Sequence, residues 1–474
     1  MQYVFINIQF SEKSFLRLFP VPFFRYNIQK QQKQNHAHLN KKGAELLMAI
    51  YDIIIIGAGA SGLFCAASFT KKIKGLLLEK NQSPAAKLLL SGSGQCNLTH
   101  RGDIRDFASR YGDNGSRIRP ILYRLSNQAL MDYFQKNGIP LITREDGKVF
   151  PKSLSAPQIA DFLLARSREN GFSLKTGAPA LEIRYAASSR LYTVIHPGGT
   201  EQAKHLVIAC GGASYPQTGS DGSILPVLSH LAQDQGKKLE IVPQRPALTP
   251  VFVQDYPYGS LSGLSFPQIR ATLRIKGEQG RLKREIQASG SLLLTHRGFS
   301  GPVILDHSRY VSSGDELSIN YLPGLFPLDM QQKLKALLSG NHKQAQTVLC
   351  QYLNQEGSFF HTEFSKRFTE LLCLRCGINP RAKAASLSGG QLRRFIDLIT
   401  QDVFRISGTG GFQWAMATAG GVALSQISAK TMECLDFPGL YMIGEVLDVD
   451  GDTGGYNLQF AFSSAFTASA GIKL

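Results

Sequence analysis

Six consecutive residues, Gly57-Ala58-Gly59-Ala60-Ser61-Gly62, have the G-x-G-x-x-G spacing of a dinucleotide-binding turn. They lie between the aliphatic run IIII at 53–56 and the helix-like stretch that begins with Leu63 and Phe64. In such a turn the first glycine permits the bend, the second lets a pyrophosphate approach the backbone, and the third lets the helix pack on the strand. Glu79 follows Gly57 by 22 residues, where a carboxylate can accept both hydroxyls of an adenosine ribose. The spacing therefore predicts an adenine dinucleotide site.

Two further glycine-rich stretches favour FAD over NAD as this dinucleotide. The loop SGSGQCN at 91–97 comes shortly after Glu79 and Lys87. Near the C-terminus, GLYMIGE and TGGYN repeat the order strand, glycine turn, helix. FAD is long and needs such a second anchor for its flavin end. A helix N-terminus at that anchor favours the negative charge that builds on the flavin during reduction.

The elements that must position these residues form one nucleotide-binding domain in two pieces. Residues 48–244 are expected to form the first piece and residues 413–474 the second, because both show a strand–turn–helix pattern. Between them, residues 245–325 read as an inserted β subdomain of short strands that closes near 401–412. Residues 326–400 read as an inserted helical subdomain. The predicted fold class is therefore α/β.

The first 47 residues differ from the rest of the chain. The segment QKQQKQNHAHLNKK is polar and of low complexity, and a strand pattern begins directly after Met48. The aromatic stretch before that segment lacks the order of a signal peptide. We expect residues 1–47 to be a disordered extension and the functional chain to begin near Met48.

Charge and cysteine content indicate which partners and which cellular compartment to expect. The net charge is +17, without a dense Lys/Arg block, so anionic cofactors or substrates are expected before nucleic acid. Seven scattered cysteines, an odd number, favour reduced thiols in the cytoplasm over a disulfide framework. A single C-x-x-C at Cys373 and Cys376 lacks a second pair at zinc spacing, so no metal site is predicted. No membrane association is expected either, since no apolar run approaches about 20 residues.

Several motifs, in order over about residues 48–474, resemble those of a bacterial flavoprotein family. They are GAGASGL, LLLEK, KLLLSGSGQCNLTH, GKVFPKS, LVIACGGASYPQTGSDG, LTHRGFSGPVIL and GLYMIGEVLDVDGDTGGYNLQFAFSS. The family is labelled the aminoacetone oxidase family of NAD(P)/FAD-dependent oxidoreductases and includes reductases of 3-dehydro bile acids. The resemblance implies a glutathione-reductase-like FAD-binding Rossmann domain with an inserted β-barrel-like part and helical part.

The resemblance also extends the set of residues expected to contact FAD. It places the 91–97 loop against the cofactor through backbone N–H groups and Asn97, and it places Ala180 at the adenine. Cys96 is then a packed residue rather than a nucleophile, and Gln95 stands where the family usually has arginine. The complete set of expected FAD contacts is Gly57, Gly59, Ala60, Ser61, Gly62, Glu79, Lys80, Lys87, Ser91, Gly92, Asn97, Ala180, Gly211, Gly444, Glu445, Gly455, Asn457 and Leu458.

The function predicted from these features is FAD-dependent oxidation or reduction of a small or medium organic substrate. The sequence contains one dinucleotide-binding motif, so a separate NAD(P)H domain is not expected. NAD(P)H or O2 would then have to react directly at the flavin. No catalytic residue is assigned, although Phe150, Tyr215, His296 and Ser300 could line the substrate side. The alternative is a basic FAD-containing protein that binds or modifies RNA.

Overall fold

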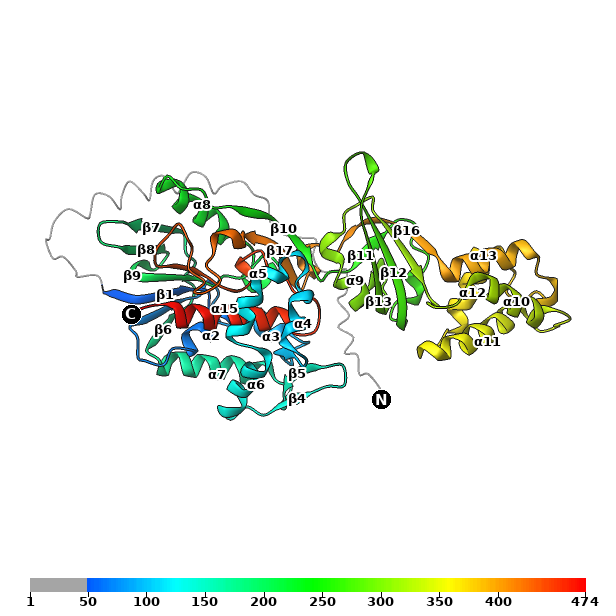
Figure 1. Ribbon diagram of the computed structural model, residues 1–474, viewed down its shortest axis with the longest axis horizontal. Coiled ribbons are helices and arrows are strands. Elements are labelled where there is room, and N and C mark those ends of the chain that lie inside the picture. Colours follow the sequence, from blue (N-terminus) through cyan, green and yellow to red (C-terminus); the bar gives the residue numbers. More distant parts are fainter. Residues whose placement is uncertain (1–48) are drawn as a thin grey trace, which may run out of the picture. The chain divides into compact units, whose positions relative to one another are not determined.

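A computed structural model of the protein describes residues 49–474 (Figure 1). The expected N-terminal extension at 1–47 lies outside the described residues. No helix within 49–474 is both long and apolar enough to cross a membrane.

A seven-stranded sheet forms the centre of the FAD-binding part. Strands β6, β2, β1 and β9 run parallel in that order, because Gly75 pairs with Ile53 of β1 and with Phe172 of β6. The long strand β9 pairs with antiparallel β8 over its first half and with parallel β18 over its second half. The bounds are β1 Ile50–Ile56, β2 Gly75–Leu78, β6 Phe172–Lys175, β7 Glu182–Ala186, β8 Leu191–His196, β9 Gly199–Ile208 and β18 Leu440–Met442.

Three helices pack together beside this sheet. Helix α2 (Ala60–Ala67) contacts both α7 (Ala156–Glu169) and α15 (Tyr456–Gly471). Helix α15 is rich in Ala, Ser and Phe on all sides and is buried along most of its length, as expected for a helix enclosed by protein. Buried hydroxyl groups of α15 form hydrogen bonds within the protein; for example, Ser463 Oγ donates to the Leu125 carbonyl at 2.8 Å.

Smaller elements complete this part. The helices are α3 Ala86–Leu90, α4 Ile104–Phe107, α5 Gly115–Arg124, α6 Asn127–Lys136 and α8 Ile224–Asp234. The strands are β3 Thr99–His100, β4 Leu141–Thr143 and β5 Lys148–Pro151, which form a three-stranded sheet.

Six strands close into a barrel between the two pieces of the FAD-binding part. The strand order is β11-β14-β13-β12-β15-β16, and β11 pairs with both β14 and β16. Buried and exposed residues mostly alternate along β12, as expected of a strand with one face in a core. The bounds are β11 Val251–Val253, β12 Ser265–Lys276, β13 Leu282–Leu294, β14 Gly298–Ser300, β15 Glu316–Asn320 and β16 Asp402–Thr409.

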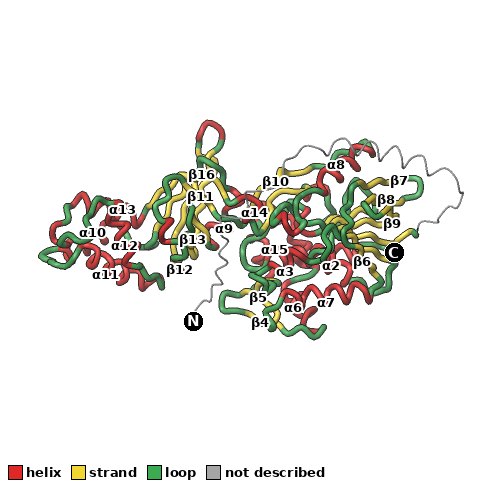
Figure 2. Tube along the Cα trace, turned by 180° about the vertical axis from the view of Figure 1, so that it is seen from behind, coloured by secondary structure: helices red, strands yellow, loops and turns green. Residues whose placement is uncertain are grey.

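Four helices separate β15 from β16 in sequence and share their hydrophobic core with the barrel (Figure 2). They are α10 Pro327–Leu338, α11 Ala345–Gly357, α12 Lys366–Arg375 and α13 Gly389–Thr400. Helix α13 begins at a capping box in which Ser388 and Gln391 bond each other's backbone N–H groups. The LSGGQ motif at 387–391 is therefore a helix start.

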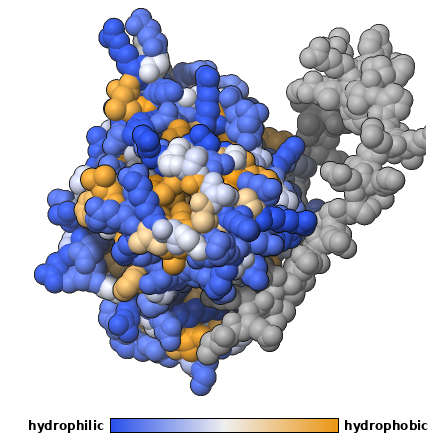
Figure 3. All heavy atoms as spheres, turned by 90° about the vertical axis from the view of Figure 1, so that its right-hand side faces the viewer, coloured by the Kyte–Doolittle hydropathy of each residue, from blue (hydrophilic) through white to orange (hydrophobic). Residues whose placement is uncertain are grey.

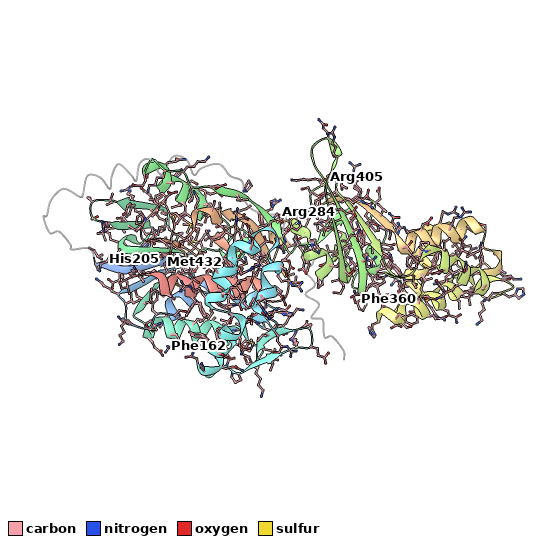
Figure 4. All side chains as sticks on the ribbon, in the orientation of Figure 1. Phe162, His205, Arg284, Phe360, Arg405 and Met432 are labelled. Carbon is pink, nitrogen blue, oxygen red and sulfur yellow. The ribbon has the colours of Figure 1, made fainter. Side chains whose placement is uncertain are left out.

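The chain crosses between the FAD-binding part and the barrel twice, through antiparallel strands β10 (Ile241–Ala247) and β17 (Ala417–Val422). A small apolar cluster of Ala247, Leu248, Leu305, Ala417 and Ala419 lies at these crossings. The short helix α14 (Gly411–Trp414) precedes β17 in sequence, and the short helix α9 (Pro302–Leu305) contributes Leu305 to the cluster. Arg284 of β13 lies where the barrel meets the FAD-binding part and pairs with Asp113 at 3.4 Å (Figure 4).

These observations confirm the predicted fold class, an α/β Rossmann-type domain with an inserted barrel and helices. The precise domain boundaries stay a prediction.

Candidate FAD-binding site

A cavity of about 660 Å³ opens at the carboxyl ends of the parallel strands of the FAD-binding sheet. It is lined by sixteen of the eighteen residues expected to contact FAD, from Gly57 in the first turn to Leu458 in α15. The two others, Gly62 and Gly444, lie behind its wall. The fold thus gathers residues that are separated by up to about 400 positions in sequence around one space.

The three glycines of the first turn have three different surroundings. Gly57 has φ +102°, and a Cβ there would lie 2.5 Å from the Ala209 carbonyl oxygen. A Cβ on Gly62 would lie 1.9 Å from the Gly57 oxygen, so both positions require glycine for backbone packing. A Cβ on Gly59 would meet no protein atom within 4 Å, and Gly59 lines the cavity. This is the arrangement that a bound pyrophosphate requires of the three positions.

The N-terminus of α2 supplies unpaired backbone donors next to Gly59. No side chain caps this helix, and Ala60 and Ser61 line the cavity. Free N–H groups and the helix dipole favour an anion at this position. The residues at the first turn therefore fit the diphosphate of FAD.

Glu79 is buried beside this turn, at 8% exposure. Its carboxylate accepts hydrogen bonds from the backbone N–H of Ala58 at 2.8 Å and of Asn81 at 2.9 Å. Burial raises its pKa, and the two N–H groups oppose that effect. Each carboxylate oxygen keeps a second acceptor position, so Glu79 fits the predicted role at the ribose.

The adenine end of the cavity contains Lys80 and Ala180. Lys80 forms an ion pair with Asp221, which also lines the cavity, and lies 3.2 Å from the Ser223 hydroxyl. The Ala178 N–H donates to the Glu79 carbonyl at 2.8 Å, which ties the Ala180 segment to the end of β2.

The second glycine turn leads into α15, the helix expected to face the flavin. Gly455 has φ +101° and precedes the helix, whose N-terminus has no side-chain cap. Asn97 lies against it: with the amide oriented to suit its neighbours, its oxygen accepts from the Gly455 N–H at 3.0 Å and its nitrogen donates to the Thr99 carbonyl at 3.0 Å. These contacts hold the turn, and the expected hydrogen bond from this amide to FAD stays a prediction.

Asn457 also uses its side chain within the protein. Its amide accepts from the Gly451 N–H and donates to the Gly451 carbonyl, both at 2.8 Å. The backbone N–H groups at the start of α15 remain available to a cofactor, and Leu458 also lines the cavity.

Lys87 and Glu445 were expected as separate cofactor contacts and instead pair with each other. Lys87 Nζ lies 2.5 Å from Glu445 Oε2, and the other carboxylate oxygen accepts from Ser214 Oγ at 2.9 Å and from the Thr418 N–H at 2.7 Å. The pair lines the cavity and neutralises its own charge there. It also fastens α3 to the segment after β18, two elements 358 residues apart in sequence.

Gly444 packs against α2 rather than facing the cavity. Its φ is +70°, and a Cβ there would lie 2.7 Å from Ser61 Oγ. Its N–H donates to Ser464 Oγ at 3.0 Å. Gly444 and Gly62 are therefore glycines because of close packing, and neither lines the cavity; their direct contact with FAD stays a prediction.

Cys96, within the 91–97 loop, has no exposed surface, and burial raises the pKa of its thiol to about 12. A thiol in this state is a poor nucleophile, in agreement with the packing role predicted for it. Gln95 next to it points to Arg144, whose guanidinium stacks 4.1 Å from the centre of the Phe150 ring. Neither Gln95 nor Phe150 lines the cavity.

A buried group of charges lies between the second turn and the barrel. Arg309 Nη1 lies 3.2 Å from Asp450 Oδ2, Arg309 Nη2 lies 2.5 Å from Asp452 Oδ1, and Asp306 accepts from the Thr453 N–H at 2.7 Å. Two carboxyls, those of Asp450 and Asp452, thus share one buried guanidinium, while Arg110 is 3.9 Å from Asp452. Burial raises the pKa of Asp452, which lines the cavity, to about 7.

The crossings between the two parts supply cavity residues that no sequence signal identified. Leu248 and Met416 line the cavity, and Met416 is bonded through its N–H to the Leu248 carbonyl at 3.2 Å. Trp414, two residues away, is 62% exposed. Of the residues expected at the substrate side, Tyr215 lines the cavity, whereas His296 and Ser300 on the barrel do not.

Among residues 49–474, no group of three His, Cys, Asp or Glu side chains is arranged to hold a metal ion.

The chain is similar to several known proteins over nearly their whole length. It is 32% identical over 428 residues to the ribosomal RNA dihydrouridine synthase of Escherichia coli, covering 89% of this chain and 98% of that protein. It is 30% identical over 427 residues to the protein of the same name from Haemophilus influenzae, with the same coverage. It is 27% identical over 423 residues to the 3-dehydro-bile acid delta(4,6)-reductase of Clostridium scindens, covering 87% of this chain and 97% of that protein.

The bile acid reductase agrees with the resemblance drawn from the motifs, whereas none of these three relatives carries the aminoacetone oxidase label. Among solved structures, a flavocytochrome c3 fumarate reductase in its open conformation superposes with a TM-score of 0.44 at 13% identity, covering 96% of this chain and 83% of that chain. The model of the HI0933-like protein Rossmann domain matches residues 51–471. The chain therefore belongs to the HI0933-like family and is an FAD-binding flavoprotein of the oxidoreductase type.

Proposed function

We propose that this protein is an FAD-dependent reductase that adds two hydrogen atoms across a ring C=C bond conjugated to a carbonyl, and that its substrate is a uracil base in ribosomal RNA. The names of the relatives support this reaction type. A dihydrouridine synthase saturates the C=C bond of uracil beside a carbonyl, and a delta(4,6)-reductase of a 3-dehydro bile acid saturates C=C bonds conjugated to a ketone. One reaction describes both.

The observation that carries the redox part of the proposal is the uncapped N-terminus of α15 on the cavity wall. Backbone N–H groups and the helix dipole there stabilise negative charge, and reduction of a flavin places negative charge on its pyrimidine edge. The Lys87–Glu445 pair brings no net charge to this wall, so the helix terminus sets the local field.

The reaction needs one hydride and one proton; we propose NAD(P)H as the source of the hydride and the solvent as the final source of the proton. FAD, held by the residues described above, would supply the hydride for the ring carbon β to the carbonyl. The α carbon then takes a proton. Asp452 is a cavity-lining carboxyl whose pKa is raised to about 7, because burial disfavours its ionised form more than Arg309 favours it. We propose its carboxyl as the source of that proton.

The choice of an RNA substrate rests on the two relatives at 30% and 32% identity, each matched over 98% of its length. A polycyclic enone is the second candidate. The exposed Trp414 and the cavity-lining Met416 favour it, because apolar side chains beside the cavity suit a fused-ring substrate.

The test is anaerobic. FAD-loaded protein is reduced with NADPH or NADH, then mixed with unmodified ribosomal RNA transcript or with a 3-keto steroid enone, while flavin absorbance is recorded. We expect RNA to reoxidise the flavin and to gain two hydrogen atoms at a uridine, detected by mass spectrometry of nucleosides. Reoxidation by the steroid alone would establish the second candidate instead, and reoxidation by neither would refute the reaction.

A further inference from the structure

The helices inserted into the barrel carry more positive charge than their own carboxylates can neutralise. Residues 326–400 contain ten Lys or Arg residues and five Asp or Glu residues. Within the described chain, ion pairs involve two of these ten cations: Lys333 with Glu356 at 2.8 Å and Arg375 with Asp402 at 2.9 Å. The remaining eight are Lys335, Lys343, Lys366, Arg367, Arg381, Lys383, Arg393 and Arg394.

Several lysines of the FAD-binding part are paired with carboxylates, whereas others, such as Lys136 and Lys238, form no ion pair among the described residues. Lys148 pairs with Asp146 at 2.7 Å and Lys204 pairs with Asp52 at 2.9 Å. Lys175 also pairs with Glu201. Exposed cations that pair with nearby carboxylates present little net charge to a partner, whereas unpaired cations remain available for one.

Four of the unpaired cations lie close together, and we name them the basic ridge: Lys343, Lys366, Arg381 and Lys383. The segments that carry them are bonded to each other. Gln344 and Lys383 form an antiparallel bridge, and the Ala384 N–H donates to the Lys343 carbonyl at 2.9 Å. The Gln346 side chain donates to the Lys366 carbonyl at 2.8 Å.

The Gln346 backbone completes the ridge, because its N–H donates to the Pro380 carbonyl at 3.1 Å, directly before Arg381. The ridge therefore joins the start of α11, the start of α12 and the segment before α13 into one surface. All four side chains belong to exposed residues. Glu363 and Glu370 are also exposed on the α12 side, and neither forms an ion pair with the ridge among the described residues.

We infer that the basic ridge binds the phosphate backbone of RNA. This inference rests on the proposed function, which supplies a polyanionic substrate. Clustered, solvent-exposed cations without internal partners bind phosphates by releasing condensed counterions, a mode that needs no base contacts. The ridge then anchors a large RNA on the inserted helices, while the uracil to be reduced reaches the cavity in the FAD-binding part.

The same helices also expose apolar side chains. Phe326, Leu328 and Phe359 are each at least 70% exposed, and Figure 3 shows apolar residues among polar ones on the face of the molecule turned toward the viewer. Such residues suit a protein partner. We favour RNA for the ridge because its four residues are all cationic, and binding of protein instead is an outcome that the experiment separates.

The experiment measures binding of fluorescent ribosomal RNA transcript to FAD-loaded, full-length protein by anisotropy at several salt concentrations. The ridge variant is Lys343→Glu with Lys383→Glu. The matched control is Lys136→Glu with Lys238→Glu, which changes the net charge equally at two exposed lysines of the FAD-binding part. Lys343→Gln with Lys383→Gln serves as a milder ridge variant, and flavin content and melting temperature verify folding.

We expect the ridge variant to bind RNA at least roughly tenfold more weakly at low salt, with the slope of log K against log salt reduced by about two. The control should keep both values. Equal losses of RNA affinity in the ridge variant and the control would contradict the assignment of RNA binding to the basic ridge. Unchanged RNA binding by the ridge variant would also contradict it, and would leave the exposed apolar residues as a site for a protein partner.

The outcomes also separate this inference from the proposed function. If the wild type reduces RNA and the ridge variant binds RNA normally, the reaction stands and the ridge fails. If RNA binds through the ridge without being reduced, the ridge stands and the reaction fails.

Discussion

The two glycine turns of the cavity differ in what holds them in place. At 57–62, the clashes that demand glycine come from within one strand–turn–helix unit and from Ala209 on the neighbouring strand. At 451–455, the turn is held by distant segments: Asn97 bonds Gly455, and Arg309 of the barrel bonds the Asp450 carbonyl at 2.9 Å. A Cβ on Gly455 would lie 2.6 Å from the backbone of Thr99.

The difference shows that two glycine turns with similar local sequences can be stabilised by different contacts. The first turn is held by its own strand and helix and by residues at the ends of the adjacent strands, Glu79 and Ala209. The second has its shape only when the 91–97 loop and the barrel are in place, so it reports on the rest of the fold. The predictions below separate the two, from the largest expected effect to the smallest.

We expect Gly62→Ala to cause the largest loss. The new Cβ would lie 1.9 Å from the Gly57 oxygen, so α2 must move off its strand. The free energy of unfolding should fall by about 2–4 kcal/mol and FAD should be lost. Gly59→Ala is the matched control, because its Cβ meets no protein atom within 4 Å; it should melt like the wild type and bind FAD weakly. A Gly62→Ala protein that is as stable as the wild type would contradict this account of the first turn.

Glu79→Ala should weaken FAD binding by about 1–3 kcal/mol, since a buried, charge-assisted acceptor for the ribose is lost. Titration of FAD into apoprotein measures this. Glu79→Gln keeps one oxygen acceptor and should lose less. Equal affinity in all three proteins would remove Glu79 from the ribose site.

Asn97→Ala tests the second turn. Because the amide bonds Gly455 and Thr99, its removal should lower the free energy of unfolding by about 1 kcal/mol and weaken FAD indirectly. Asn457→Ala should behave alike, since its amide holds Gly451. If Asn97→Ala instead altered the flavin spectrum at unchanged stability, the direct contact expected from the sequence would be correct.

Asp452→Asn tests the link between the second turn and the barrel. The pKa of Asp452 is raised to about 7 in the folded protein, so its stabilising contribution is present below pH 4 and is lost as the pH rises through 7. Wild-type stability should therefore fall between pH 5 and pH 8, and the variant should show about 1–2 kcal/mol less of that fall. Urea unfolding at the two pH values measures the difference. Parallel pH profiles would show that Asp452 is already ionised at pH 5.

Cys96→Ser should have the smallest effect. The side chain has no exposed surface and its thiol pKa is raised to about 12, so the variant should keep FAD and its rate of flavin reduction. Anaerobic stopped-flow reduction is the measurement. An FAD-loaded but inactive variant would make Cys96 a nucleophile after all.

Sequence reasoning succeeded where the determinants are close together in the chain. The glycine spacing at 57–62, the aliphatic β1 strand and Glu79 form one unit of about 30 residues, so pattern and geometry coincide. The cofactor and the fold class followed from this unit and from its partial repeat before α15.

The remaining features depend on contacts between distant segments. Lys87 and Glu445 neutralise each other across 358 positions, and a single sequence gives no sign of such a pair. Asn97 was correctly placed at the cavity, but its amide oxygen accepts from the N–H of Gly455, a residue 358 positions away in sequence. Leu248 and Met416 belong to crossings between two parts of the fold, and their role appears only when both crossings are seen together.

Trp414 is the chain's single tryptophan, and it lies two residues from the cavity-lining Met416. Indole emission overlaps the absorption of oxidised flavin, so a bound flavin near this residue quenches its fluorescence by energy transfer. The protein thus contains its own optical reporter. Every cofactor titration described above can be read from one emission signal without a label, and any rearrangement at the second crossing changes that signal as well.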